Sequence, residues 1–163
     1  MSDSILDGKR MLLVDDEPDV LTLLEEELKD ACPNCVLDKA MDYETAVKML
    51  ESNPYDIAVL DIMGVRGFDL LELAVRKNLK VAMLTAHALS PEALKKSHDM
   101  GARAYLPKEK LGEIVPFLED VLRYEFQTGW KHLLETLQDF FLRRFDWEKS
   151  TGKSWKEWTQ NWY

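Results

Sequence analysis

The chain has 163 residues, of which 46% are apolar and 31% are charged. This composition excludes a disordered or collagen-like chain, and the length suffices for one domain with a well-buried core plus a short additional segment. No stretch approaches the roughly 20 apolar residues that span a bilayer, and the N-terminus lacks the apolar region of a signal peptide. We therefore expect a cytoplasmic protein without a membrane partner.

The net charge of −9 is confined to the first part of the chain. Residues 1–123 contain 15 basic and 24 acidic side chains, whereas residues 124–163 contain 6 of each. The last 40 residues also hold all five Trp residues and 11 of the 16 aromatic residues. The acidic balance disfavours nucleic acid as a partner. The change in composition predicts one domain over residues 1–126 and a helical extension over residues 127–163, which is too short to fold as an independent domain.

Five short apolar segments alternate with segments of helical periodicity in the first part. Pro18, Asp42 and Ser90 are typical of helix starts, Gly101 is typical of a helix end, and a fifth helix is expected from Glu113 to about Phe126. This alternation predicts a doubly wound α/β domain. The apolar segments, which predict strands buried on both faces, are Arg10–Val14, Cys35–Leu37, Ile57–Leu60, Val81–Leu84 and Ala104–Leu106.

Polar side chains stand where four of the five predicted strands end. Asp15 and Asp16 follow the first strand, Asp61 the third, Thr85 the fourth and Lys108 the fifth. The carboxyl ends of parallel strands share one edge, where α/β domains bind their ligands. Carboxylates gathered there repel each other by on the order of 4 kcal/mol per pair at ~4 Å, and Mg²⁺ with a phosphoryl group would offset this repulsion. Each residue alone has an ordinary structural explanation, but their coincidence at one edge predicts such a site.

Four motifs, in this order, resemble the receiver domain of two-component response regulators over about residues 8–125. The resemblance implies a flavodoxin-like five-stranded parallel sheet of order 2-1-3-4-5 with helices on both faces, followed here by the C-terminal helical extension. The motifs are MLLVDDEPDVL at Met11–Leu21, AVLDIMGVRGFDLLEL at Ala58–Leu73, VAMLTAHA at Val81–Ala88 and GARAYLPKEKL at Gly101–Leu111.

The resemblance implies that Asp61 is the phosphoacceptor and that Mg²⁺ is bound by Asp15, Asp16, Asp61 and the backbone carbonyl of Met63. The loop after Asp61 departs from the common family pattern. Many receivers have a Met-Pro pair after the phosphoacceptor and a Gly eight positions on. Here the Pro is absent and Gly67 follows Asp61 by only six positions, so the loop is expected to be two residues shorter.

The resemblance also assigns the remaining site residues. Thr85 and Lys108 are expected to act with the phosphoacceptor, and the Ala86 backbone and Lys108 are expected to bind phosphoryl oxygens. Thr85 and Tyr105 are expected to form the switch, in which Tyr105 turns inward after phosphorylation. In place of the family's usual Lys-Pro pair, Lys108 is followed by Glu109.

The chain is therefore expected to be a phosphorylation-activated response regulator. It would accept a phosphoryl group from a histidine kinase on Asp61 and signal by protein-protein contact, with self-phosphorylation and autodephosphorylation as its only chemistry. One alternative is a phosphorelay intermediate that passes the group to a histidine phosphotransfer protein. Another is a phosphorylation-independent scaffold that acts through the C-terminal helices. An aspartyl phosphatase is disfavoured, because Met63 stands where such hydrolases usually have a second Asp.

Two further features of the first part have competing explanations. Cys32 and Cys35 have the CxxC spacing, but no second pair completes a zinc site. We expect two reduced thiols in a turn, with a redox dithiol as the alternative. His87 follows Thr85 by two positions, where it either tunes water access to the acyl phosphate or is a solvent-facing loop residue.

The residues after Tyr124 predict aromatic-faced helices. A break at Gln127–Gly129 precedes a helix of about 17–19 residues, and a break at Ser150–Gly152 precedes a short one. These faces could be covered by the receiver itself, by a second copy in a homodimer or by another protein. A membrane surface and a DNA-binding output are disfavoured, because these residues carry no basic excess. The residues on the two faces are Trp130, Leu133, Leu134, Leu137, Phe140, Phe141 and Phe145, and then Trp155, Trp158 and Trp162.

Overall fold

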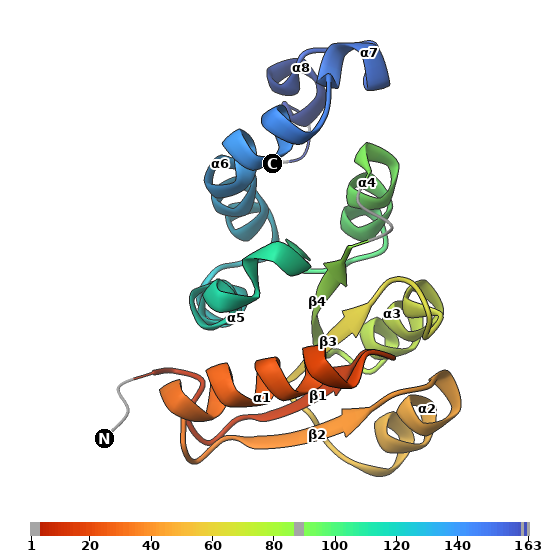
Figure 1. The fold of residues 1–163 in the computed structure, drawn as a ribbon, viewed down its shortest axis with the longest axis vertical. Coiled ribbons are helices and arrows are strands. Elements are labelled where there is room, and N and C mark those ends of the chain that lie inside the picture. The colour runs from red at the N-terminus through yellow and green to blue at the C-terminus, as the bar shows by residue number, and fades with distance from the viewer. Residues whose placement is uncertain (1–3, 87–89, 161, 163) are drawn as a thin grey trace.

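The computed structural model describes residues 4–86, 90–160 and 162. Its first part is built on a five-stranded parallel sheet in the order β2-β1-β3-β4-β5 (Figure 1), which confirms the predicted sheet. The strands are β1 (Arg10–Val14), β2 (Val36–Ala40), β3 (Ile57–Asp61), β4 (Lys80–Thr85) and β5 (Ala104–Pro107).

Helices connect the strands and cover both faces of the sheet. Helices α1 and α5 pack together, and α2 packs against α3. The side chains of Asp42 and Ser90 cap α2 and α4, because they accept the backbone N–H groups of Thr45 and Ala93. The helices are α1 (Pro18–Ala31), α2 (Tyr43–Ser52), α3 (Gly67–Arg76), α4 (Pro91–Asp99) and α5 (Ile114–Arg123), with a 3₁₀-helix, η1 (Lys108–Glu113), between β5 and α5.

Two elements differ from the predicted boundaries. β2 begins at Val36 and runs to Ala40, beyond the apolar run Cys35–Leu37. It is an edge strand whose residues before Ala40 are exposed or half-buried, so its second half is polar and does not show as an apolar segment. The fifth helix is also shorter than predicted, because residues 108–113 form η1 and the helix ends at Arg123.

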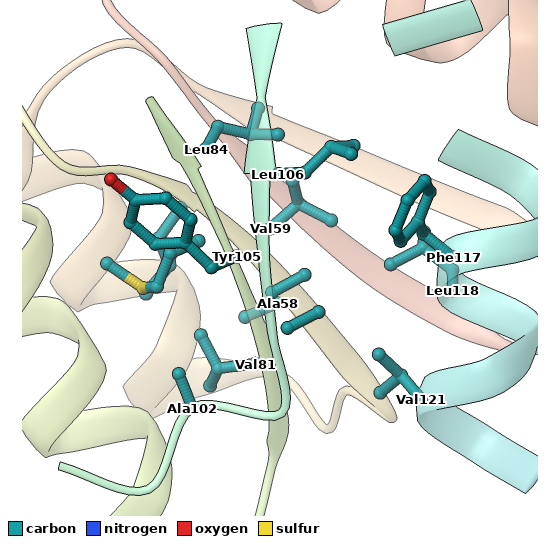
Figure 2. Close-up of a cluster of buried hydrophobic side chains, with 14 of the residues drawn as sticks. Ala58, Val59, Val81, Leu84, Ala102, Tyr105, Leu106, Phe117, Leu118 and Val121 are labelled. Atoms are coloured by element: carbon teal, nitrogen blue, oxygen red, sulfur yellow. The ribbon is translucent and has the colours of Figure 1, made fainter. Parts of the chain in front are cut away.

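The hydrophobic core lies on both faces of the central strands. All residues of β3 and β5 are buried, as continuous apolar strands of a parallel sheet require. Figure 2 shows Tyr105 on one side of β5, whereas Leu106 lies on the other side with Phe117 and Leu118 of α5. Burying each such large side chain contributes about 1.5–3 kcal/mol to folding. The strand that precedes Lys108 is therefore held firmly from both sides.

The described part of the C-terminal extension forms three helices, α6 (Phe126–Arg144), α7 (Trp147–Thr151) and α8 (Trp155–Thr159). The predicted break at Gln127–Gly129 is wrong: these residues lie in the first turns of α6, and the chain is extended instead at Tyr124 and Glu125. A glycine near the start of a helix, such as Gly129, costs little helix stability. The next residue, Trp130, anchors the helix because its Nε1 donates to the carbonyl of Ala102 at 2.8 Å. Tertiary contact therefore outweighs the local preference.

The second half of the extension also differs from the expected single helix. The Asp146 side chain accepts the Lys149 N–H to start α7. The predicted break at Ser150–Gly152 is wrong for Ser150 and Thr151, which lie in this helix. Gly152, with φ of 77°, ends that helix, as a left-handed residue commonly does. α8 then ends at Thr159, so Trp162 lies beyond the helix that was predicted to include it.

The extension packs on the β5 end of the sheet domain, opposite the β2 end (Figure 1). α6 contacts α5 and β5, and α7 contacts α4. Trp130 and Trp162 are buried and contact each other, and the ring of His98 on α4 packs against both, with centroid distances of 5.2 and 4.5 Å. Of the three expected coverings, the structure thus shows the first: the aromatic faces pack against the sheet domain of the same chain.

No described helix is both long enough and apolar enough to traverse a membrane.

Candidate functional site

Three carboxylates meet at the carboxyl edge of the sheet. Asp15 directly follows β1 and is fully buried, Asp16 beside it is exposed, and Asp61 is the buried last residue of β3. One oxygen from each lies within 4.8 Å of the others. β1 and β3 are paired neighbours, so the strand register brings the three together as the sequence predicted.

Lys108 enters this cluster from the end of β5. Its Nζ lies 2.8 Å from Oδ2 of Asp15, 3.4 Å from Oδ1 of Asp61 and 3.7 Å from Oε1 of Glu17. The lysine side chain is only 10% exposed and both aspartates are buried, so these two ion pairs act with little solvent screening, whereas Glu17 is half exposed. Among the described residues, the site therefore contains one buried cation against several carboxylates, a balance that leaves room for further positive charge.

Burial and mutual repulsion shift the protonation equilibria of these groups. Burial, followed by the charge of Asp15, raises the pKa of Asp61 to about 7, although Lys108 opposes the shift. Burial also raises the pKa of Asp15, against the stabilising hydrogen bonds from Lys108 and the Glu17 N–H. Burial disfavours the Lys108 ammonium, but Asp15 and Asp61 outweigh it and raise its pKa. Burial and mutual repulsion thus disfavour the charged form of these carboxylates, and a bound cation would stabilise that form.

The loop after Asp61 is shaped by two glycines that pack against the cluster. Gly64 has φ of 85°, and a Cβ there would lie 2.3 Å from an Asp16 oxygen. At Gly67, the first residue of α3, a Cβ would lie 2.1 Å from the Asp61 carbonyl. A Cβ at position 67 would collide with backbone, whereas at position 64 it would displace the Asp16 carboxylate and adopt an unfavourable φ, so glycine is favoured at both positions. Met63 lies in the same short turn with its side chain exposed; the role of its carbonyl stays a prediction.

Thr85 and Tyr105 lie together on the side of the cluster toward α4. Thr85 ends β4 and is buried, and Tyr105 is fully buried one strand away. The Ser90 N–H donates to the Tyr105 hydroxyl at 3.4 Å. Burial raises the pKa of Tyr105 to about 12, although the Ser90 N–H and the Thr85 hydroxyl act against this shift. Tyr105 thus takes the inward position here, and Ala86 follows Thr85 at the strand exit.

Sequence reasoning missed three residues that shape the site. Glu17 approaches Lys108, Gly64 packs on Asp16, and Ser90 contacts the Tyr105 hydroxyl. Glu17 directly follows the predicted Asp pair, which was an available signal, but the other two contacts depend on how loops fold back. His87, which was considered near the site, lies outside the described residues.

The cysteine pair lies away from this edge, between α1 and β2. Cys32 and Cys35 are buried free thiols, and their Sγ atoms are 3.0 Å apart. Burial and the neighbouring Cys35 raise the pKa of Cys32 to about 12. A reactive dithiol needs a thiolate near neutral pH, so this environment favours the expected reduced, structural thiols.

A 2-1-3-4-5 parallel sheet with an acidic cluster and a lysine at its carboxyl edge defines a flavodoxin-like domain with a cation and anion site at that edge. Residues 11–118 match the response regulator receiver domain, and the chain belongs to this family. Receiver domains of this family bind Mg²⁺ at an acidic pocket, and Asp15, Asp16 and Asp61 form such a pocket here.

Known proteins similar to this chain support the assignment. Two-component response regulator ARR18 of Arabidopsis thaliana is 38% identical over 132 residues, which cover 78% of this chain and 19% of that protein. Transcriptional regulatory protein TcrA of Mycobacterium tuberculosis is 33% identical over 105 residues, which cover 62% of this chain and 40% of that protein. The chain thus spans well under half the length of these relatives.

Solved structures show the same fold. A putative response regulator from Chloroflexus aurantiacus has a TM-score of 0.63 and 26% identity, with 72% of this chain and 100% of that chain covered. A CheY-like receiver domain protein from Methanospirillum hungatei has a TM-score of 0.58 and 27% identity, with 69% and 94% covered. The chain is therefore a two-component receiver domain carrying additional C-terminal helices.

Proposed function

We propose that this chain is a phosphorylation-activated response regulator whose Asp61 accepts a phosphoryl group from the phosphohistidine of a histidine kinase. The observation that supports this most strongly is the placement of Lys108, whose Nζ lies 3.4 Å from the Asp61 carboxylate and 2.8 Å from that of Asp15. A carboxylate nucleophile beside a buried cation and two further carboxylates has the groups that aspartyl phosphate formation requires.

In the proposed transfer, a carboxylate oxygen of Asp61 forms a bond to phosphorus as the bond from phosphorus to the imidazole nitrogen breaks. The electron pair of the broken bond leaves with the imidazole, which takes up a proton. Lys108 neutralises charge on the phosphoryl oxygens, so the chain contributes mainly position and electrostatics. Water later hydrolyses the acyl phosphate and regenerates the Asp61 carboxylate.

The acidic cluster fits Mg²⁺, because each of the three Asp residues offers a carboxylate oxygen within one small volume. Asp15, Asp16 and Asp61, together with the Met63 carbonyl, are the residues that would hold it. When bound, Mg²⁺ supplies positive charge to the phosphoryl oxygens. The glycine at position 64 leaves the space that the Asp16 carboxylate occupies, because a side chain there would collide with it.

Thr85 and Ala86 are proposed to hold the phosphoryl group from the β4 side. The Thr85 hydroxyl and the Ala86 backbone N–H would each donate to a phosphoryl oxygen. Thr85 and Tyr105 are buried on the paired strands β4 and β5, so occupation of the site is expected to reach Tyr105, and through Ser90 the start of α4. The signal would then pass to other proteins by contact, without catalysis of any metabolic reaction.

The expected phosphodonor indicates both the protein partner and the cellular location that we propose for this chain. A histidine kinase presents its phosphohistidine in the cytoplasm, where we accordingly place this chain. Transfer onward to a histidine phosphotransfer protein is the alternative role for the same site. It would be recognised by reversible transfer of the phosphoryl group between Asp61 and such a protein.

Incubation with acetyl phosphate and Mg²⁺ tests the proposed chemistry directly. We expect a mass gain of one phosphoryl group that is lost on treatment with hydroxylamine, as an acyl phosphate requires, and that maps to Asp61. The Asp61→Asn variant should gain nothing. Asp69→Asn removes an exposed carboxylate on α3 and should be phosphorylated like the native chain. Equal labelling of Asp61→Asn, or no labelling of the native chain, would contradict the proposal.

A further inference from the structure

The segment that carries Lys108 is contacted on both sides of that residue by the C-terminal extension. Tyr105 on β5 is fully buried, and its ring centroid lies 6.1 Å from that of Phe141 on α6. Glu109 directly follows Lys108, and both of its carboxylate oxygens accept from the Arg144 guanidinium at 2.6 Å. The last turn of α6 thus contacts Tyr105 and Glu109, which lie on either side of Lys108 in the sequence.

The Tyr105 hydroxyl connects this contact to the phosphoryl site. It accepts the Ser90 N–H at 3.4 Å. On the neighbouring strand β4, the buried Thr85 hydroxyl oxygen has no hydrogen-bond partner among the described residues. When Thr85 donates to a phosphoryl oxygen, its own oxygen can still accept from Tyr105. Hydrogen bonds in such a chain polarise and strengthen one another, so a phosphoryl group on Asp61 stabilises Tyr105 in the inward position seen here.

The contact at Tyr105 is continuous with the aromatic packing of the whole extension. Phe141 stacks on Trp155 of α8, with ring centroids 5.7 Å apart and an interplanar angle of 25°, and also contacts Trp147 of α7. Trp147 in turn packs on Trp158 at 4.9 Å, which contacts Trp162 at 4.7 Å. A change at Tyr105 therefore reaches aromatic rings in all three helices of the extension.

We propose that the α6–α8 extension is an intramolecular partner of the receiver. Its contact with Tyr105 and Glu109 is coupled to phosphorylation of Asp61. A phosphoryl group on Asp61 stabilises this contact, and the bound extension in turn raises the affinity of the site for the phosphoryl group. The two effects are equal in size, because a coupling free energy between two sites is reciprocal. This inference rests on the proposed function, since it needs Asp61 and Thr85 to hold a phosphoryl group.

Tryptophan emission of the full chain provides a direct measurement. All five Trp residues lie in the extension, so no added label is needed. We expect Mg²⁺ with beryllofluoride, a phosphoryl mimic, to change the emission saturably at the affinity measured by calorimetry. Tyr105→Phe keeps the ring against Phe141 but removes the hydroxyl. It should bind the mimic roughly fivefold more weakly, at the lower end of ordinary coupling, and lose most of the emission change.

A matched pair of arginines tests the second contact. Arg144→Gln removes the ion pair to Glu109, whereas Arg143→Gln alters a neighbour whose Nε donates to the Asp139 carbonyl of its own helix. Because the Arg144 pair is exposed, we expect only a two- to threefold weaker affinity for beryllofluoride, and no change for Arg143→Gln. This surface pair keeps the test valid should Tyr105→Phe fail to fold.

The outcomes separate the two proposals. Native chain that does not bind the mimic would overturn the proposed function and, with it, the coupling. Binding with constant Trp emission, and with equal affinity in Tyr105→Phe, Arg144→Gln and Arg143→Gln, would overturn the coupling alone. A saturable emission change that weakens in Tyr105→Phe and Arg144→Gln but not in Arg143→Gln supports it.

Discussion

Lys108 and Asp15 form the shortest ion pair of the site, with 2.8 Å between Nζ and Oδ2 and both side chains nearly or fully buried. They follow β5 and β1, which are separated in the sheet by β3 and β4. The long lysine side chain thus crosses the carboxyl edge and neutralises the cluster from the far side. Lys108 and Mg²⁺ are consequently competing partners for the same carboxylates, which gives the first prediction.

Lys108→Met should bind Mg²⁺ more tightly than the native chain and yet be phosphorylated more slowly. Removing the ammonium leaves Asp15 and Asp61 without their buried counter-charge, so the incoming cation is attracted more strongly. The phosphoryl oxygens, however, lose a fixed positive partner, and we expect the acetyl phosphate reaction to slow about 10²-fold or more. Calorimetry and the mass assay measure the two effects.

Lys77→Met, which replaces an exposed lysine at the end of α3, is the matched control and should change neither quantity. Weaker Mg²⁺ binding in Lys108→Met would show that the lysine supports the metal site rather than competing with the metal.

The metal-free chain should become less stable as pH rises from about 4 to about 7. The pKa of Asp61 is raised in the folded state to about 7, whereas an unfolded Asp titrates near ~3.9. Between these values the folded state binds more protons than the unfolded state, so the free energy of unfolding falls with increasing pH. The loss is on the order of 2–4 kcal/mol at pH 8, an upper estimate for one group.

Asp61→Asn isolates this contribution, because the amide cannot titrate. Without Mg²⁺ we expect the variant to be more stable than the native chain at pH 8 and the difference to shrink or reverse at pH 4, as measured by urea unfolding. Adding Mg²⁺ should stabilise the native chain by ligand linkage and the variant much less. A native chain that gains stability relative to Asp61→Asn as pH rises, without metal, would contradict the raised pKa.

Gly64→Ala should weaken Mg²⁺ binding without unfolding the domain. The new Cβ would lie 2.3 Å from an Asp16 oxygen, and the φ of 85° is unfavourable for alanine. Asp16 is exposed and its side chain can move, so the metal site should suffer more than the core, with about tenfold lower Mg²⁺ affinity and ~1 kcal/mol lower stability.

Gly112→Ala is the control for this substitution, because a Cβ there meets nothing within 4 Å. It should leave Mg²⁺ affinity unchanged in the same titration. Equal Mg²⁺ affinity in the native chain and Gly64→Ala would show that Asp16 is not a ligand whose position matters.

Trp130→Phe should destabilise the protein by about 2–4 kcal/mol. Trp130 is fully buried and its Nε1 donates to the Ala102 carbonyl at 2.8 Å, so the smaller ring leaves a cavity and an unsatisfied acceptor. Trp158→Phe, at a half-buried position on α8, should cost less than about 1.5 kcal/mol. Unfolding followed by circular dichroism measures both. Equal losses would indicate that α6 is not anchored through Trp130.

The sheet and the cluster at its edge were accessible from sequence because both depend on local patterns. Apolar runs of β1, β3 and β4 identify strands buried on both faces, and Asp15, Asp61 and Thr85 stand at their ends. Topology then brings the ends together with little freedom. β2 was misplaced because an edge strand needs no apolar second half, and the start of α6 was misplaced because Gly129 looks locally like a break.

What the sequence by itself determined was the receiver framework, the residues at its carboxyl edge and the aromatic character of the tail. Only the tertiary structure decided what covers that tail and that Phe141 and Arg144 sit on Tyr105 and Glu109. The physical reason is that apolar periodicity requires a helix face to be buried without specifying against what. The covering surface is set by contacts between residues distant in the chain, such as Trp130 with Ala102.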